Sequence, residues 1–285
     1  MGKPANPAPV ADPVASAALI RHPAGERIGL HAHAQGQLSV VLEGTMRIGC
    51  KDGWWLAPAG RGIWVPAGLK HSASYSERSA FVLIKIAATH AGTLPDDVRS
   101  IAVPDLLRAL ALEIAGPPPV EDAAERALLG QLIVRRIGAS GTVAPFLFLP
   151  SGSDPRLLRL TEALRDDPGS TASLDELAAA AGSSRRTMSR LFVAETGMPF
   201  ARWRDHLRIV AAVDRLVRGV PIQQVAFELG YNSQSSFTTL FTRIVGLPPA
   251  RYLRQMTASP PRPSPGGAAA GRAIAAQKRG GLAGS

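Results

Sequence analysis

The sequence of 285 residues has one cysteine, Cys50, and no long apolar run. A single cysteine excludes an internal disulfide and a cysteine-rich zinc cluster. No segment approaches the ~20 apolar residues that a membrane-spanning helix needs. The apolar run from Val14 to Ile20 is too short for a secretory signal and leads into Arg21. These absences predict a cytoplasmic protein with no membrane partner.

Acidic residues are also missing from one part of the chain. None follows Glu228, although the formal net charge of the protein is +10. Seven basic residues occupy that acid-free end: Arg243, Arg251, Arg254, Arg262, Arg272, Lys278 and Arg279. A basic end of this kind favours a polyanionic partner, although a solubilising tail would have the same composition.

The pattern of the remaining chain predicts an α+β protein of two domains. Short apolar runs broken by Gly and Pro indicate a β-barrel, and two amphipathic segments at 104–115 and 121–137 trail it. Those helices either cover the barrel or pair with a second subunit, with Leu128, Leu129, Leu132 and Ile133 as interface candidates. The expected boundaries are a disordered segment at 1–14, a sensor and dimerisation domain at 15–138, a linker at 139–153, a helical domain at 154–257 and a disordered basic tail at 258–285.

The helical domain contains the same short pattern twice, at 174–192 and at 222–241. Each copy is an apolar helix, a glycine, two further residues and then a polar helix. Gly182 and Gly230 suit turns that need a positive φ, and Ser184 and Ser233 suit N-caps. Two helix-turn-helix units predict binding to double-stranded DNA through two successive major grooves.

Residues 154–256 resemble the DNA-binding domain of the AraC/XylS family of bacterial transcription regulators. The most specific stretch is 226–252, which includes Gly246 and the pair Pro248-Pro249. Helix geometry and the resemblance together give the expected DNA-contacting side chains: Arg185, Arg186, Ser189 and Arg190 in the first recognition helix, and Gln234, Ser235, Thr238 and Thr239 in the second. Arg suits guanine edges or phosphates, Gln suits adenine, and Ser and Thr suit phosphates or a thymine methyl.

The N-terminal segments 25–44 and 60–75 are similar to the paired motifs of the cupin superfamily, a small β-barrel. His31, His33 and His71 fall at metal-ligand positions of that motif, whereas Gln37 replaces the usual Glu and Tyr75 replaces the usual Asn. Two histidines on alternate positions of one strand point the same way, and a third imidazole can complete a set for a divalent metal. The alternative is an organic effector, with Trp64 stacking on it. The expected effector-binding set is therefore His31, His33, Gln37, Trp64, His71 and Tyr75.

Three functions fit these observations. The first is a non-enzymatic, homodimeric transcription regulator controlled by a small-molecule or metal effector in the barrel, with RNA polymerase as a further partner. The second is a metal-dependent cupin enzyme fused to a DNA-binding domain, which the missing Glu and the lack of further acid–base residues disfavour. The third is an architectural DNA-binding protein with a vestigial barrel. The sequence does not name the effector, the operator or the direction of regulation.

Overall fold

The computed structural model describes residues 14–116, 123–141 and 147–257. Nearly all of the two termini expected to be disordered lie outside the described residues. The first domain begins with the strands and a 3-10 helix: β1 Ala15–His22, β2 Arg27–His31, β3 Gly36–Glu43, β4 Thr45–Cys50, β5 Gly53–Pro58, β6 Arg61–Val65, β7 His71–Ser74, β8 Ser79–Ile86, η1 Ala88–Thr93 and β9 Arg99–Ala102. Then follow α1 Asp105–Ala115, α2 Ala123–Gly138, β10 Phe148–Pro150, α3 Pro155–Asp166, α4 Leu174–Ala180, α5 Arg185–Thr196, α6 Phe200–Val217, α7 Ile222–Glu228, α8 Gln234–Val245 and α9 Pro249–Thr257.

The strands form two antiparallel five-stranded sheets. Their orders are β1-β8-β3-β6-β9 and β10-β5-β4-β7-β2. Side chains alternate between the faces of each strand, so that Trp55 and Ala57 point into the space between the sheets while Trp54 and Leu56 point outward. The core between the sheets draws on both of them, including Val41, Ile48 and Phe81. The predicted β-domain with two trailing helices is confirmed.

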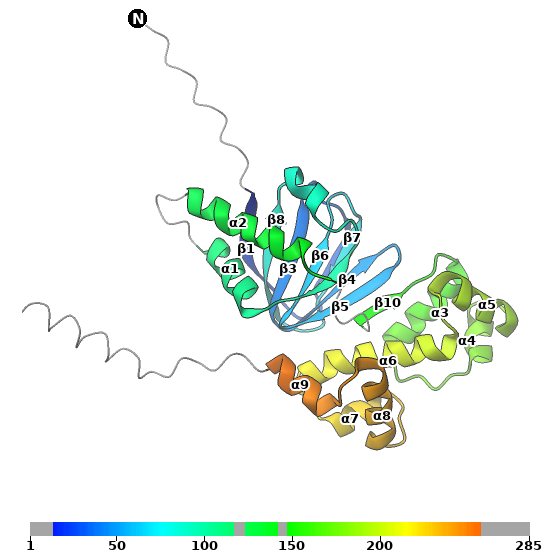
Figure 1. Ribbon diagram of the computed structural model, residues 1–285. Helices are drawn as coiled ribbons and strands as arrows, with labels where there is room; N and C mark the ends of the chain where they lie inside the picture. The colour runs from blue at the N-terminus through cyan, green and yellow to red at the C-terminus, as the bar shows by residue number, and fades with distance from the viewer. Residues whose placement is uncertain (1–13, 117–122, 142–146, 258–285) are drawn as a thin grey trace, which may run out of the picture.

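Helices α1 and α2 cover the outer face of the first sheet (Figure 1). Leu107 and Ile114 of α1 and Ile133 and Ile137 of α2 are fully buried against it. Ile133 therefore cannot contact a second subunit, which corrects its place among the interface candidates. Leu128 points the other way and is 65% exposed. The amphipathic pattern of α2 thus serves mainly to cover the sheet.

The outer face of the second sheet packs on the C-terminal domain. Strand β10 lies within the expected linker, yet it pairs with β5, and Leu149 is fully buried. Trp54 and Leu56 join the same hydrophobic cluster as Leu157 of α3 and Leu207 of α6. The two domains therefore share a continuous apolar interface, which a free linker would not create.

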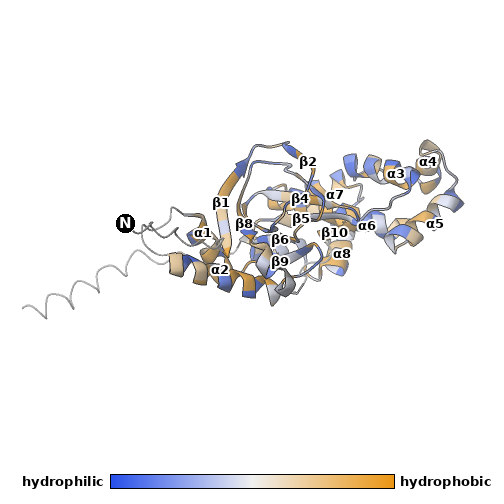
Figure 2. Cartoon of the chain, turned by 90° about the horizontal axis from the view of Figure 1, so that it is seen from above, coloured by the Kyte–Doolittle hydropathy of each residue, from blue (hydrophilic) through white to orange (hydrophobic). Residues whose placement is uncertain are grey.

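The C-terminal domain is entirely helical in its described residues, as predicted. The central helix α6 joins the pair α4 and α5 to the pair α7 and α8 (Figure 1). Along these helices hydrophobic and hydrophilic stretches alternate, as in helices that pack on one side (Figure 2). No helix of the described residues is long and apolar enough to cross a membrane.

Candidate functional site

Helix α5 presents a polar face at the end of the first helix-turn-helix unit. Gly182 has φ +70°, and the Ser184 hydroxyl caps the helix by accepting a hydrogen bond from the Thr187 N–H at 3.2 Å. Met188 and Phe192 are fully buried and fix the helix against the domain core. The remaining face is exposed, and it carries all four side chains expected there: Arg185, Arg186, Ser189 and Arg190.

Helix α8 repeats this arrangement in the second unit. Gly230 has φ +78°, and the Ser233 hydroxyl accepts from the Ser236 N–H at 3.1 Å. Gln234, Ser235 and Thr239 are exposed, whereas Thr238 is half-buried. The Thr239 hydroxyl donates to the Ser235 carbonyl at 3.0 Å. One of the four expected side chains is therefore bonded to its own helix and another is half-buried, whereas all four on α5 are exposed.

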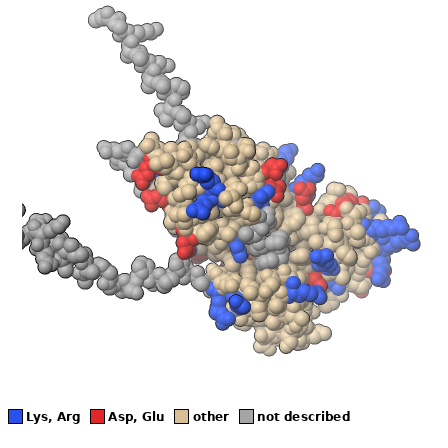
Figure 3. Space-filling view, viewed as in Figure 1, with Lys and Arg blue, Asp and Glu red and all other residues tan. Residues whose placement is uncertain are grey.

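The two faces also differ in charge. Basic side chains gather at the end of the molecule where α5 lies (Figure 3). Arg185 contacts Asp175 of α4 at 3.2 Å, but both side chains are more than 60% exposed. Such an exposed pair contributes little and leaves the guanidinium accessible to a phosphate. The four expected positions of α8 carry uncharged amide and hydroxyl groups instead, which suit base edges, and the exposed cation of this helix is Arg243 in its last turn, paired with Asp205 at 3.3 Å.

The structure brings His31, His33 and His71 together at one end of the β-domain. His31 of β2 pairs directly with His71 of β7, and His33 follows β2. The ring centroids lie 4.4 Å apart for His31 and His71, 4.8 Å for His31 and His33, and 5.3 Å for His33 and His71. Their candidate ligand atoms all lie within 4.8 Å of one another. Within the described residues, this group contains no carboxylate and no cysteine.

Backbone carbonyls orient two of these rings. His31 Nδ1 lies 2.7 Å from the Gly29 carbonyl, and His71 Nδ1 lies 3.0 Å from the Leu69 carbonyl. In the tautomer that carries its proton on Nδ1, each ring donates to its carbonyl and leaves Nε2 free as a ligand. Burial lowers the pKa of His71 and of His33, and the neighbouring imidazoles lower the His33 value further. Both rings therefore favour the neutral form, which a metal requires.

Two buried polar atoms near this end lack partners. His71 is 1% exposed, and its Nε2 makes no hydrogen bond. Gln37 is also buried on β3, and it alternates with Leu38 so that its side chain points between the sheets. Its Nε2 donates weakly to the Ser39 hydroxyl at 3.4 Å, whereas its Oε1 has no partner. Buried polar atoms are rarely left unpaired, so these two favour a bound group.

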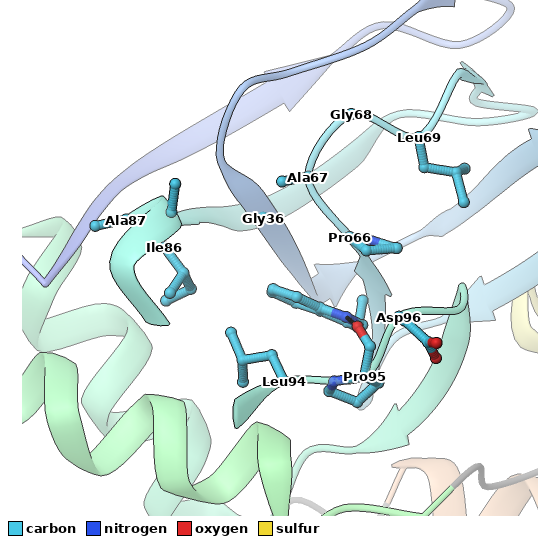
Figure 4. A pocket seen from close by; sticks show the side chains of 12 residues that line it. Gly36, Pro66, Ala67, Gly68, Leu69, Ile86, Ala87, Leu94, Pro95 and Asp96 are labelled. Carbon is cyan, nitrogen blue, oxygen red and sulfur yellow. Dashed lines mark hydrogen bonds between the residues drawn. The ribbon is translucent and has the colours of Figure 1, made fainter. Parts of the chain in front are cut away.

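Trp64 lies on the opposite face of its strand from this cluster. Ile63 and Val65 point between the sheets, while Trp64 packs under the covering helices and donates from Nε1 to the Pro95 carbonyl at 2.8 Å. It forms one wall of an apolar pocket of about 420 Å³ (Figure 4). Alternation along β6 therefore turns Trp64 away from the histidines and into a separate pocket, and its contact with an effector stays a prediction.

Tyr75 is also separate from the histidine cluster. It follows β7 by one residue and lies four residues beyond His71, which is about 13 Å along an extended strand. Its ring stacks on His22 at 4.2 Å between centroids. Burial, and the nearby charge of Glu26, raise the pKa of its hydroxyl. Tyr75 therefore belongs to the core and does not complete the histidine set.

Sequence reasoning missed Asp214 of α6, which is buried where the two domains meet. Its Oδ1 accepts hydrogen bonds from Thr45 Oγ1 at 2.7 Å and Ser76 Oγ at 2.9 Å. Its Oδ2 accepts from Arg47 at 3.3 Å and from Arg218 at 3.2 Å. Three of these four partners belong to the β-domain and lie more than 130 residues away in the sequence. No local pattern marks such a residue.

Comparisons with known proteins agree with this architecture. Residues 13–135 match the model of an AraC-like ligand binding domain, and residues 177–255 match that of a helix-turn-helix domain. The chain is 29% identical over 235 residues to the HTH-type transcriptional regulator NimR of Escherichia coli, covering 82% of this chain and 85% of that protein. It is 34% identical over 99 residues to the HTH-type transcriptional regulator RipA of Corynebacterium glutamicum, covering 34% of this chain and 30% of that protein.

A solved structure of ToxT from Vibrio cholerae aligns with 86% of this chain and 100% of its own length, at 11% identity and a TM-score of 0.38. The family matches carry the assignment, because together they account for both the β-domain and the paired helix-turn-helix units. The chain is therefore a member of the AraC-type family of transcriptional regulators, with a ligand-binding domain followed by a DNA-binding domain.

Proposed function

We propose that this regulator senses a divalent transition metal at the cluster of His31, His33 and His71. The observation that carries this proposal is the convergence of three imidazoles, two of them oriented by backbone carbonyls, around a buried Nε2 that has no partner. Imidazole suits Zn²⁺, Cu²⁺, Fe²⁺ and Ni²⁺. Gln37 Oε1 would supply a neutral oxygen as a fourth ligand.

The residues of the cluster fit a metal better than a large organic effector. A metal would neutralise no carboxylate here, so the bound site keeps the full charge of the ion. Its role would be to hold His33, which follows β2, against His31 and His71 on the paired strands β2 and β7, and no reaction is needed for that. Such an arrangement suits a sensor. The testable alternative is an organic effector that binds to the same three histidines.

DNA binding would then depend on both recognition helices. Arg186 and Arg190 of α5 are exposed cations that can reach bases or phosphates, and Gln234 and Ser235 of α8 are exposed neutral groups that can read base edges. We place the regulator in the cytoplasm as a homodimer that acts on RNA polymerase at a promoter. Leu128 of α2, exposed and apolar, is the best-placed contact for the second subunit.

Metal titration of the untagged full-length protein tests the sensor. Isothermal titration with Zn²⁺ and with Ni²⁺ should give one site per chain in the wild type and a loss of at least tenfold in affinity for His33→Ala and His71→Ala. His90→Ala is the matched control, because His90 lies on η1 outside the cluster, and it should bind as the wild type does.

Operator binding measured with and without the metal completes the test. The wild type should change its affinity for DNA when the metal binds, whereas His71→Ala should bind DNA equally in both conditions. Equal metal affinity in all variants would overturn the proposal. If the wild type binds no metal but responds to an organic molecule through these histidines, the effector is organic and the metal proposal fails.

A further inference from the structure

A cleft between the two domains has no role in the function proposed above. It has a volume of about 510 Å³ and lies between the outer face of the second sheet and helices α3 and α6. Strands β2, β4, β5 and β7 form one wall, with Gly29, Gly49 and Ser72 leaving room between larger side chains. Arg165 and Leu207 form part of the other wall. Each domain therefore contributes half of the cleft.

The β-domain wall carries two N–H donors without acceptors. Arg47 of β4 stacks over the ring of Trp54 of β5, with its Cζ 5.6 Å from the ring centroid. The Nε of Arg47 and the Nε1 of Trp54 are both buried and make no hydrogen bond. Trp54 is only 7% exposed, so its N–H has left water without gaining a partner. An unpaired buried donor is costly, and an acceptor in the cleft would remove that cost.

The opposite wall presents a further cation. Arg165 of α3 lines the cleft, and its pKa is lowered, mainly by burial; the charges of Glu162 and Asp166 oppose this shift, and the charge of Arg47 adds to it. Two guanidinium groups from different domains therefore approach each other, and Arg27 adds a third at the rim. Like charges repel across an interface unless an anion lies between them.

The acidic residues of the cleft do not fully offset these cations. Glu162 and Asp166 also line it, and Glu162 lies 3.6 Å from Arg165. Both carboxylates belong to α3, on the same wall as Arg165, so neither reaches the unpaired donors of Arg47 and Trp54 by any contact that the structure describes. The β-domain wall thus offers the Trp54 N–H and the Arg47 guanidinium, whose Nη2 already donates to Asp214, and N–H donors of this kind recognise oxyanions.

We propose that this cleft binds a small organic anion through carboxylate or phosphate oxygens, held by Arg47 and Trp54 on one side and Arg165 on the other. A ligand that contacts both walls binds only when the domains are together, so it stabilises that arrangement by its own affinity. Arg47 also contacts Asp214. The anion and the interdomain contact therefore share one side chain, which connects the cleft to the position of the DNA-binding domain.

Thermal unfolding and isothermal titration of the full-length protein test this site. The probes are succinate, inorganic phosphate and the neutral diamide succinamide, at millimolar concentration and matched ionic strength. At least one anion should bind and raise the Tm, whereas succinamide should not. A preference for succinate or for phosphate then identifies the ligand as a carboxylate or a phosphate ester.

Two variants locate the binding. Arg165→Gln removes the cation of α3, and Trp54→Phe keeps the ring but removes the N–H donor. Each should weaken the anion at least tenfold, whereas Arg136→Gln on the exposed side of α2 should bind as the wild type does. Binding of succinamide equal to succinate, undiminished affinity in both cleft variants, or no binding of either anion would overturn the proposal. Arg165→Gln should still bind Zn²⁺ normally, which separates this test from that of the histidine site.

Discussion

Single residues with the same role in the sequence differ in what surrounds them. Gly182 and Gly230 occupy equivalent turns, and both have a positive φ. A Cβ on Gly182 would meet no atom within 4 Å, whereas one on Gly230 would lie 2.8 Å from the Gly169 carbonyl oxygen. The sequence pattern predicts both turns, but only the packed domain makes the second one tight.

Replacing each of these glycines by alanine should separate backbone strain from crowding. Gly182→Ala should lower the free energy of unfolding by about 1–2 kcal/mol, the cost of a left-handed conformation for an L residue. Gly230→Ala should cost about 1–3 kcal/mol more, because a backbone carbonyl must also move. Urea unfolding followed by circular dichroism measures both, and equal losses would show that the Gly169 loop yields freely.

At the scale of elements, α5 and α8 are two copies of one motif with different surfaces. The expected contact positions of α5 include three arginines, whereas those of α8 are uncharged, with the Thr239 hydroxyl bonded to its own helix and Arg243 only in the last turn. We therefore expect α5 to contribute both attraction and base contacts, and α8 to contribute base contacts through Gln234.

Alanine at Arg190 and at Gln234 should distinguish these contributions. Each variant should lose about 1–3 kcal/mol of operator affinity if the side chain that it removes contacts a base. Arg190→Ala should also lower the salt dependence of binding, because a cation near phosphates releases counterions, whereas Gln234→Ala should leave the salt slope unchanged. Fluorescence anisotropy on operator and random DNA across a salt series gives both quantities. Equal losses on the two DNAs would assign Arg190 to phosphate alone.

The exposed side of α2 carries the prediction on assembly. Leu128 is 65% exposed on a helix whose other face covers the sheet. In a symmetric dimer two copies would be buried, each contributing about 1.5–3 kcal/mol, so Leu128→Gln should raise the dimer Kd on the order of a hundredfold or more. Sedimentation at micromolar concentration measures this, with Leu19→Gln on β1 as an equally apolar, 41% exposed control. If the wild type is already monomeric at this concentration, α2 only covers the sheet and does not form a dimer contact.

At the scale of the whole molecule, the domains are joined by a shared apolar cluster and by the buried carboxylate of Asp214. The apolar contacts supply attraction without direction. The hydrogen bonds of Asp214 fix the angle of α6 relative to β4, because a buried acceptor must keep its donors in place. A signal in the β-domain that moves Thr45 or Arg47 would therefore reach the helix that connects both DNA-binding units.

Asp214→Asn should weaken this connection while both domains stay folded. Removing one partner of a buried ion pair costs about 3–5 kcal/mol, and we expect the lower end, because Arg47 and Arg218 keep 37% and 33% of their side chains exposed. Calorimetry should show two transitions where the wild type shows one. Asp205→Asn on the same helix, whose partner Arg243 belongs to the same domain, should leave a single transition. A single transition in Asp214→Asn would show that the apolar cluster alone holds the domains.

The sequence by itself determined the elements and the family. The amphipathic periodicity at 104–115 and 121–137, the caps at Ser184 and Ser233 and the histidine spacing are local patterns, and local patterns follow from backbone geometry and nearest neighbours. They were enough to predict a β-domain, two trailing helices and paired helix-turn-helix units, and to select three histidines that the structure brings together.

Only the tertiary structure decided what lies opposite each of these elements. In the tertiary structure Trp64 faces away from the histidines, and Tyr75 and Ile133 are buried in the core. Part of the expected linker forms strand β10 and pairs with β5. The tertiary structure also placed Asp214 and the interdomain cleft between segments far apart in the chain. Such contacts depend on how two faces meet in space, and that arrangement leaves no periodic trace in either segment.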